Sequence, residues 1–435
     1  MTDTDMRNHP FARSEELLQR ALGHIPLGTQ TFSKSRTQYP HGVSPFYAAR
    51  AKGSRLWDVD GNEYTDFVNA LAAVTLGYQD ADVDGAVRAQ MEEGVLFTLP
   101  HPIEIEVSEK LCEMIPCAEM VRFGKNGSDA TSGAVRLSRA YTGRDHVACC
   151  GYHGWQDWFI GTTARSLGVP QAVRDLTHTF TYNDLESLEA LFKKWPDDIA
   201  CVIMEPMNVV YPAPGFLGGV QELCRKHDAV FVLDEMISGF RYAKGGAQEL
   251  FGITPDLATF GKGLANGYPL STIAGRADIM KLMEDVFFSF TMGSEALSLA
   301  AAGATLDKIN REPVIETTHE MGIKIIDGVT QRIASHGVDH IFGITGHPSW
   351  SILTIADAGP YSNWDIRTLF LQEMFARGIL TLATHNMSYA HTAEDVVKLL
   401  TAYDEILPLI AAAVGGETLQ KELRCDPLVP LFKVR

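Results

Sequence analysis

The feature that most constrains the fold is the alternation of short apolar runs with helical segments between residues 75 and 275. Each apolar run is preceded or followed by a helix-like stretch such as Gly218–Lys226. Alternation at this spacing predicts a mostly parallel sheet with helices on both faces, an α/β fold. The clearest predicted strands are Val147–Cys150, Ala200–Met204, Ala229–Leu233 and Leu257–Phe260.

The two ends of the chain have a different character. Residues 1–74 carry a helical pattern followed by short strands, and residues 331–435 mix strands with amphipathic helices. We therefore expect a large domain at residues 75–330 and a smaller α+β domain built from both termini. The elements expected in it are a helix at 12–24, strands between Tyr47 and Val68, strands Ile341–Ile344 and Ser351–Ile355, and helices Asp365–Arg377 and Ala393–Ala413.

Bulk properties exclude several classes of protein. A chain of 435 residues is too long for one ordinary core, so two or three domains are expected. The net charge of −17 argues against a nucleic-acid partner. No apolar run reaches the roughly 18 residues of a membrane span, and Met1–Asp5 is acidic rather than a secretory signal. The seven cysteines show no CxxC pair or metal-ligand spacing, which predicts a cytoplasmic protein with reduced thiols and no metal site.

Polar side chains follow four of the predicted strands at their carboxyl ends. Tyr152 and His153 follow the first strand, Glu205 the second, Asp234 the third and Lys262 the fourth. Ligands of open α/β sheets gather at this edge. One acid at a strand end is usually a cap or a turn residue, whereas polar residues at four such ends predict a site.

Lys262 and Asp234 indicate the chemistry of that site. Lys262 lies between Gly261 and Gly263, in the segment that follows the last of these strands. Pyridoxal phosphate requires a lysine that forms an imine with its aldehyde and a carboxylate that keeps its ring nitrogen protonated. Most lysines are solvated surface groups, so the Gly-Lys-Gly sequence is weak alone. Together with Asp234 it makes pyridoxal 5′-phosphate the candidate cofactor.

A phosphate group would need donors of its own. Gly127 and Ser128 precede a predicted helix at Ala130–Ala140. A Gly-Ser step there exposes backbone N–H groups beside the positive end of the helix dipole, which suits an anion. A plain helix cap at Ser128 or Asp129 explains the same residues, so both interpretations stay open.

In combination these motifs resemble the class III aminotransferases, which are fold type I enzymes dependent on pyridoxal phosphate. The resemblance is greatest to the branch that contains glutamate-1-semialdehyde aminomutase, and it spans about residues 15–410. It implies that family's fold and its cofactor. The segments that carry it are Leu56–Asn62, Arg136–Asp145, Tyr152–Gly154, Glu205-Pro206, Leu233–Arg241, Thr259–Leu270 and Ala390–Thr392.

The resemblance also implies roles for single residues. Lys262 would form the internal aldimine and later move a proton between the substrate and the cofactor, and Asp234 would pair with the ring nitrogen. Tyr152 would stack on one ring face, and Met236, where the family usually has a β-branched residue, would cover the other. The remaining implied roles are phosphate binding by Gly127 and Ser128, supporting contacts from His153 and Glu205, and a phosphate contact by Thr291 across a homodimer interface.

Three departures from the family bear on the substrate. Val210 stands where many members have a glutamate that gates an arginine, and the segment Thr384–Tyr389 is shorter than in the aminomutase and lacks its glutamate. Lys34 stands where the aminomutase has a carboxylate-binding arginine, and lysine loses the bidentate fork. Lys34 or Arg36 is therefore expected for any substrate carboxylate. Trp155, which with Trp158 and Phe159 follows the first strand end, either lines the pocket or belongs to the core.

These features favour an aminotransferase that moves an amino group from a donor amine or amino acid to a keto acid, aldehyde or ketone by a ping-pong mechanism. Two alternatives stay open. One is an isomerase that shifts an amino group within one molecule, and the other is a non-catalytic binding protein with the same fold. The intact pair of Lys262 and Asp234 disfavours the last, because a protein freed from catalysis needs neither residue.

Overall fold

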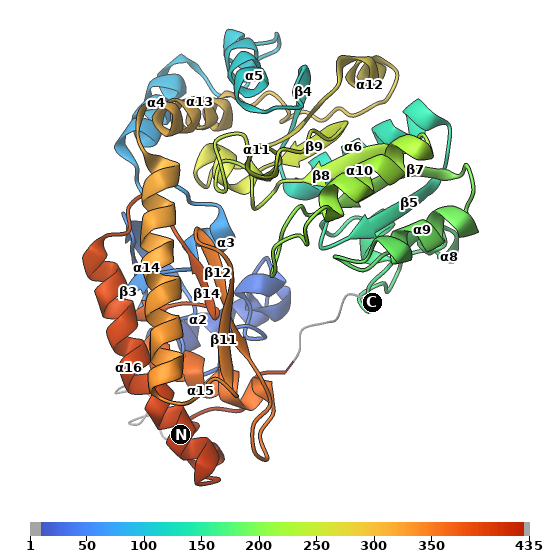
Figure 1. Cartoon of the computed structure of the whole chain (residues 1–435). Helices are drawn as coiled ribbons and strands as arrows, with labels where there is room; N and C mark the ends of the chain where they lie inside the picture. The colour runs from blue at the N-terminus through green and yellow to red at the C-terminus, as the bar shows by residue number, and fades with distance from the viewer. Residues whose placement is uncertain (1–9, 430–435) are drawn as a thin grey trace. The chain divides into compact units, whose positions relative to one another are not determined.

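The computed structural model describes residues 10–429, and the chain divides into two compact units. Residues 73–75 and 81–315 belong to the larger unit, and residues 10–72, 76–80 and 316–429 belong to the smaller one. The acidic N-terminal residues Met1–Asp5 lie outside the described residues. No helix between residues 10 and 429 combines the length and apolar character that a membrane crossing requires. Figure 1 labels the elements of both units.

The larger unit is built on a seven-stranded sheet in the order β4-β10-β9-β8-β7-β5-β6. Strand β10 is antiparallel to both of its neighbours, and the other pairs are parallel, so the expected mostly parallel sheet is confirmed. The sequence analysis did not name β4, β6 or β10, because polar or small residues interrupt or replace the apolar run in each of them. The strands are β4 (Met120–Gly124), β5 (His146–Cys150), β6 (Thr177–Thr179), β7 (Ile199–Met204), β8 (Val230–Asp234), β9 (Leu257–Phe260) and β10 (Ser271–Gly275).

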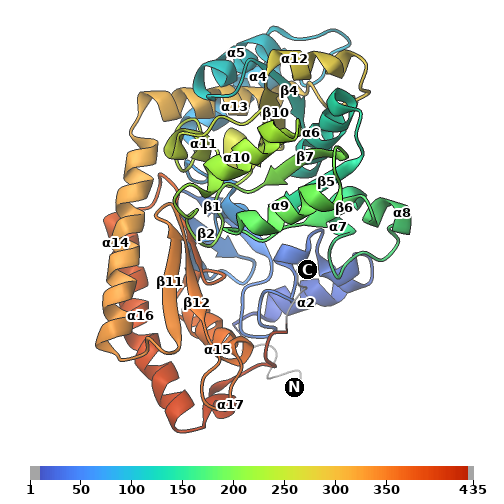
Figure 2. The same ribbon diagram turned by 45° about the vertical axis from the view of Figure 1, so that its right-hand side comes forward.

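Helices cover both faces of this sheet. Ala130, Ala134 and Leu137 of α6 pack on one face against Cys201 and Val232. Helices α9 and α10 lie side by side over the other face (Figure 2). The helices and helical turns of this unit are α4 (Ala81–Glu93), α5 (Pro102–Met114), α6 (Gly127–Thr142), α7 (Asp157–Ile160), α8 (Gln171–Arg174), α9 (Leu185–Lys194), α10 (Phe216–Lys226), α11 (Ala247–Phe251), η3 (Lys262–Ala265), α12 (Ala277–Met280), η4 (Lys281–Glu284) and α13 (Ala296–Arg311).

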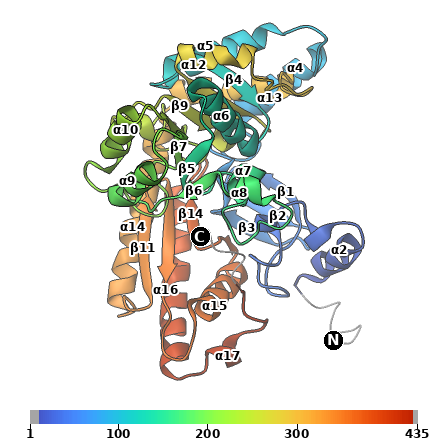
Figure 3. The same cartoon turned by 90° about the vertical axis from the view of Figure 1, so that its right-hand side faces the viewer.

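The smaller unit contains two sheets, β1-β2-β3-β13 and β11-β12-β14. Strand β13 pairs in parallel with β3, so segments from both ends of the chain share one sheet. Figure 3 shows β1–β3 with α2 next to them. The elements are α2 (Ala12–Leu22), η1 (Pro26–Gly28), η2 (Phe32–Lys34), β1 (Ala48–Lys52), β2 (Arg55–Asp58), β3 (Glu63–Asp66), α3 (Asn69–Ala72), α14 (Val314–Ser335, which begins at the boundary), β11 (Phe342–His347), β12 (Trp350–Ile355), α15 (Asn363–Ala376), β13 (Ile379–Leu380), β14 (Thr384–Asn386), α16 (Ala393–Gly415) and α17 (Leu419–Glu422).

One segment of the smaller unit has a strained backbone. In α3 (Asn69–Ala72) four successive non-glycine residues have φ between 47° and 65°, a left-handed conformation that costs about 1–2 kcal/mol per residue. Asp66 fixes the start of this turn. Its carboxylate accepts the N–H groups of Val68 at 2.7 Å and Asn69 at 3.0 Å, and the hydroxyl of Tyr78 at 2.7 Å. Strain of this kind concentrates at functional sites, and α3 contributes Ala70 and Leu71 to the lining of a cavity.

Candidate active site

Asp234 is the last residue of β8 and is buried, with 3% of its surface exposed. It pairs with Thr259 in the parallel register of β8 and β9, and the Thr259 hydroxyl donates to Asp234 Oδ1 at 3.3 Å. The same oxygen accepts the backbone N–H of Met236 at 3.1 Å, and Oδ2 lies 2.8 Å from Nδ1 of His153. A carboxylate has about four lone-pair sites. The three contacts fix its orientation and leave it one site for a ligand.

His153 is buried behind Asp234. Its Nδ1 faces the carboxylate and its Nε2 lies 3.1 Å from the carbonyl oxygen of Cys150. The Thr131 hydroxyl donates to the backbone carbonyl of His153 at 2.8 Å, and the ring stacks on Trp158. These contacts leave the imidazole little freedom to rotate. His153 is therefore placed to hold Asp234.

Lys262 is the first residue of η3 and has φ of 44°, which is rare for a residue with a side chain. The glycines on either side of the lysine both have close neighbours. A Cβ at Gly261 would lie 2.8 Å from Sδ of Met236, and a Cβ at Gly263 would lie 2.5 Å from the hydroxyl of Thr75. The two glycines let neighbouring side chains pack directly against the lysine turn.

The surroundings of Lys262 shift its amine towards the neutral form. Burial lowers the pKa of the Lys262 amine, and the carboxylates of Glu205 and Asp234 oppose this effect. Burial and the charge of Asp234 raise the pKa of Glu205, whose Oε2 accepts the N–H of Tyr152 at 3.0 Å and the amide of Asn208 at 2.7 Å. A lysine with a lowered pKa is neutral, and therefore nucleophilic, at a lower pH than a solvated one.

Helix α6 begins at Gly127, and its cap is Asn126 rather than Ser128 or Asp129. The Asn126 side chain accepts the N–H of Asp129, and the Asp129 carboxylate accepts the N–H of Asn126. This capping box leaves the N–H groups of Gly127 and Ser128 without a protein acceptor in the described chain. Together with the Ser128 hydroxyl they form an anion site at a helix N-terminus.

The loop after β5 lies against this helix start. The hydroxyl of Ser128 accepts the N–H of Trp155 at 3.2 Å. Gly154 has φ of 108°, and a Cβ there would lie 2.1 Å from the Ser128 hydroxyl oxygen. Only glycine fits at this position, because any side chain would displace Ser128.

The aromatic residues of the same loop divide into two groups. Tyr152 is 51% exposed and Trp155 is 63% exposed, so both are available to a ligand. Trp158 and Phe159 are buried in the core cluster that packs on α6. The core interpretation is therefore correct for Trp158 and Phe159, but not for Trp155.

Of the remaining expected residues, the structure places only some beside the helix start and the lysine turn. Met236 lies between the helix start and the lysine turn, since a Cβ at Gly127 would lie 3.0 Å from its sulfur. Thr291 lies on the exposed segment between η4 and α13. Lys34 and Arg36 belong to the smaller unit, where Lys34 lines a cavity and Arg36 does not.

Sequence reasoning missed several residues that support the site. Thr259 contacts Asp234, Asn208 contacts Glu205, and the guanidinium of Arg241 donates to Thr75 beside the lysine turn. Of these contacts, only the one between Asn208 and Glu205 joins residues that are close in the sequence. An amide side chain three residues after Glu205 could therefore have been recognised as its partner from the sequence. The others join residues that only the strand register and the tertiary packing bring together.

The fold and the site define an enzyme that works with pyridoxal phosphate, and comparison with known proteins identifies its family. The model of the class III aminotransferases matches residues 38–393. The chain therefore belongs to the class III aminotransferases.

Three relatives illustrate this similarity. The chain is 35% identical over 409 residues to 3-aminobutyryl-CoA aminotransferase of Cloacimonas acidaminovorans (91% of this chain and 97% of that protein). It is 36% identical over 414 residues to glutamate-1-semialdehyde 2,1-aminomutase of Syntrophobacter fumaroxidans (88% and 94%). The FumI protein of Sphingopyxis sp. MTA144, solved in its PLP internal aldimine form, matches with a TM-score of 0.86 at 30% identity (95% and 98%).

The residues present fit pyridoxal phosphate. Two unpaired N–H groups and a hydroxyl at the start of α6 suit its phosphate, and an oriented carboxylate with one lone pair left, at Asp234, suits its ring nitrogen. The ring of Tyr152 is exposed and open to stacking, and the sulfur of Met236 lies between the start of α6 and the lysine turn. Each part of the cofactor therefore has a chemically matched partner in the larger unit.

Replacing Asp234 tests the ring-nitrogen contact. Asp234→Asn keeps the size of the side chain and removes its charge, so turnover should fall by at least 100-fold, on the order of the 3–5 kcal/mol lost with a buried charge partner. The cofactor should stay bound, because its phosphate donors are unchanged. Steady-state kinetics and cofactor stoichiometry measure the two effects.

The control is Glu235→Gln at the fully buried neighbour that accepts the N–H groups of Ala247 and Gln248. It should lower stability while sparing the turnover of folded protein. An Asp234→Asn enzyme within about threefold of wild type, at full cofactor occupancy, would show that Asp234 does not face the ring nitrogen.

Proposed function

We propose that the protein is an aminotransferase that passes an amino group from a donor amine or amino acid to a keto acid, aldehyde or ketone of a second molecule by a ping-pong mechanism. The proposal rests mainly on the composition of the loop after β7. Val209, Val210 and Tyr211 are 43–49% exposed there, in place of a gating carboxylate. Glu205 is buried and already accepts two hydrogen bonds. The likeness to 3-aminobutyryl-CoA aminotransferase also supports intermolecular transfer.

Pyridoxal phosphate supplies an aldehyde that amines can exchange and a ring that accepts the electron pair released at the substrate carbon. Lys262 would offer the amine that holds the cofactor, and the same amine could carry a proton to and from the substrate carbon. Asp234, fixed by His153 and Thr259, would keep the proton on the ring nitrogen. Gly127 and Ser128 would hold the phosphate.

The alternative is an isomerase that shifts an amino group along one molecule. Its support is the 36% identity to a glutamate-1-semialdehyde 2,1-aminomutase. An isomerase must retain its carbonyl intermediate while the amine moves, and this requires firm contacts to the rest of the substrate. Val210 and Lys34 replace two residues expected to make such contacts, which favours the transferase.

Running the two half-reactions one after the other distinguishes these two functions. The loaded enzyme is mixed with an amine donor alone, freed of small molecules by gel filtration, and then given a keto acid or aldehyde. The aminotransferase should keep the amino group on its cofactor through filtration and deliver it to the acceptor with near-unit stoichiometry. Isomerisation of an amino-aldehyde or diamino substrate, with no exchange of nitrogen between labelled and unlabelled molecules, would contradict the proposal.

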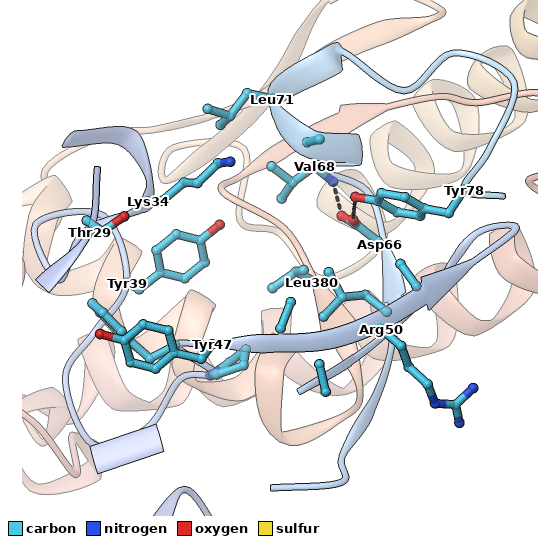
Figure 4. A pocket seen from close by; sticks show the side chains of 17 residues that line it. Thr29, Lys34, Tyr39, Tyr47, Arg50, Asp66, Val68, Leu71, Tyr78 and Leu380 are labelled. Carbon is cyan, nitrogen blue, oxygen red and sulfur yellow. Dashed lines mark hydrogen bonds between the residues drawn. The ribbon is translucent and has the colours of Figure 1, made fainter. Parts of the chain in front are cut away.

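Lys34 is the residue that we propose for a substrate carboxylate. It lines a cavity of about 470 Å³ in the smaller unit, most of whose lining is apolar. Figure 4 shows the Lys34 amine and the Tyr39 hydroxyl directed into this cavity, whereas Arg50 points away from it. The Lys34 amine has no ion-pair partner among residues 10–429, while Asp66 is occupied by three hydrogen bonds. An anionic ligand could therefore pair with Lys34 without displacing another charge.

Lys34→Met should raise KM about 10- to 100-fold for amines that carry a carboxylate, the scale of one charged hydrogen bond. Amines without a carboxylate should keep their KM. The matched control is Arg50→Met, because Arg50 lies over the ring of Trp57 and faces away from the cavity. Equal KM values for both classes of amine in Lys34→Met would remove Lys34 from the substrate site.

We infer that the protein is a homodimer. Val95, Leu96, Phe97 and Leu99 are exposed on the larger unit, and so are Phe287, Phe290 and Met292. The two segments meet where the N–H of Ala296 donates to the carbonyl of Val95. Apolar surface gathered in this way is typical of an interface, and Thr291 belongs to it, as expected for a residue that reaches a phosphate in the other subunit.

Light scattering should give the mass of a dimer. Phe287→Asp should dissociate the dimer and weaken cofactor binding, because it buries a charge in the interface. Leu167→Asp is the control, since Leu167 is fully exposed and outside this surface. A monomeric wild type, or a Phe287→Asp protein that stays dimeric with the cofactor bound as tightly, would contradict the inference.

We propose a cytoplasmic location. All seven cysteines are free thiols, as is usual in a reducing compartment. Fractionation of the native cells checks this, and recovery of the protein among secreted proteins would contradict it.

A further inference from the structure

Arg241 is a large cation buried close to the lysine turn. It lies in the loop after β8 and is 2% exposed, and no other arginine or lysine among residues 10–429 is buried as fully. Its Nη2 donates to the hydroxyl of Thr75 at 3.2 Å. Burial lowers the pKa of Arg241 to about 10. Burying a guanidinium costs stability, and such groups persist where they specify an arrangement or serve a function.

Thr75 connects Arg241 to both ends of the turn that carries Lys262. A Cβ at Gly263 would lie only 2.5 Å from the hydroxyl oxygen of Thr75, so the two residues are in close contact. The backbone N–H of Thr75 donates to Oδ1 of Asn266 at 2.9 Å, and Asn266 ends η3. Thr75 is 1% exposed, so water does not compete for these contacts. One threonine therefore touches the residue after Lys262, the end of its turn and the buried cation.

The turn needs such contacts because its backbone is strained. Lys262 and Asn266 both have φ of 44°. Left-handed residues with side chains persist only where the surrounding structure holds them. Gly261 packs against Met236 on one side of Lys262, and Gly263 packs against Thr75 on the other.

We propose that Arg241 and Thr75 form a clasp that holds the Lys262 turn in its strained conformation and places a positive charge near the lysine amine. Both are positioning residues rather than catalytic ones. The charged groups that act on the amine are the carboxylates of Glu205 and Asp234, which favour its protonated form, and Arg241, which opposes them. The clasp rests on the proposed function, because it matters only if Lys262 binds the cofactor.

The first test measures how fast cofactor-free enzyme captures pyridoxal phosphate, followed by the change in absorbance as the cofactor attaches. Thr75→Val keeps the shape of the side chain but removes the hydroxyl, and it should slow capture at least tenfold. Thr75→Ser keeps the hydroxyl and should restore the wild-type rate. The matched control is Thr163→Val, a buried threonine whose hydroxyl donates to the carbonyl of Ile160. It should lose similar stability on heating and capture the cofactor normally.

The second test measures the capture rate as a function of pH, since only the neutral amine reacts. Arg241→Gln removes the positive charge and should raise the midpoint of the profile by about one pH unit. Arg241→Lys keeps the charge and should leave the midpoint within a few tenths of a unit of wild type. The ionisations of pyridoxal phosphate itself are common to all these proteins and cancel in the comparison.

The outcomes distinguish the clasp from the function on which it rests. If Thr75→Val captures the cofactor at the wild-type rate, or if folded Arg241→Gln keeps the wild-type midpoint, the clasp is wrong while the aminotransferase stands. If Arg241→Gln fails to fold, the Thr75 variants decide. A wild-type protein that takes no cofactor on Lys262 would overturn the proposed function itself.

Discussion

The site depends on a carboxylate that is buried and held in one orientation. Asp234 ends a strand in the middle of the sheet, and a carboxylate there is stable only when its oxygens have partners. His153, Thr259 and the N–H of Met236 supply them. These partners come from the loop after β5, from strand β9 and from the second residue after β8. The parallel arrangement of β5, β7, β8 and β9 therefore determines where the site can form.

The close packing of side chains against three glycines is the second constraint on the site. Gly154 leaves room for Ser128, Gly261 for Met236 and Gly263 for Thr75. At each position a methyl group would stand within 3 Å of a side-chain atom, closer than atoms approach without a shift in structure. The glycines thus bring the phosphate site and the lysine turn against their neighbours. Substitution by alanine at any of them would displace a residue of the site.

Much of this arrangement follows from the sequence. The apolar runs predicted β5, β7, β8 and β9 to within one residue at each end, because buried parallel strands are apolar throughout. The polar residues that follow these strands then lie at one edge of the sheet. This rule places Lys262 and Asp234 at the same edge of the sheet.

Other features have no local signal. Asn126, Ser128 and Asp129 are all good helix caps, and only the geometry selects Asn126. The left-handed turn Asn69–Ala72 contains no glycine, and the buried carboxylate of Asp66 that fixes its start gives no pattern in the sequence. Thr75 reaches Asn266 across almost two hundred residues, so its contact with the lysine turn depends on the tertiary fold.

The central claim is that Lys262, displayed on a strained turn beside Asp234, is the residue that binds the cofactor. Reduction of the loaded enzyme with borohydride, followed by digestion and mass spectrometry of the peptides, tests it most directly. We expect a single stable pyridoxyl label, located on Lys262, and no label in Lys262→Ala. A label on any other lysine, or a Lys262→Ala protein that still acquires one, would contradict this assignment.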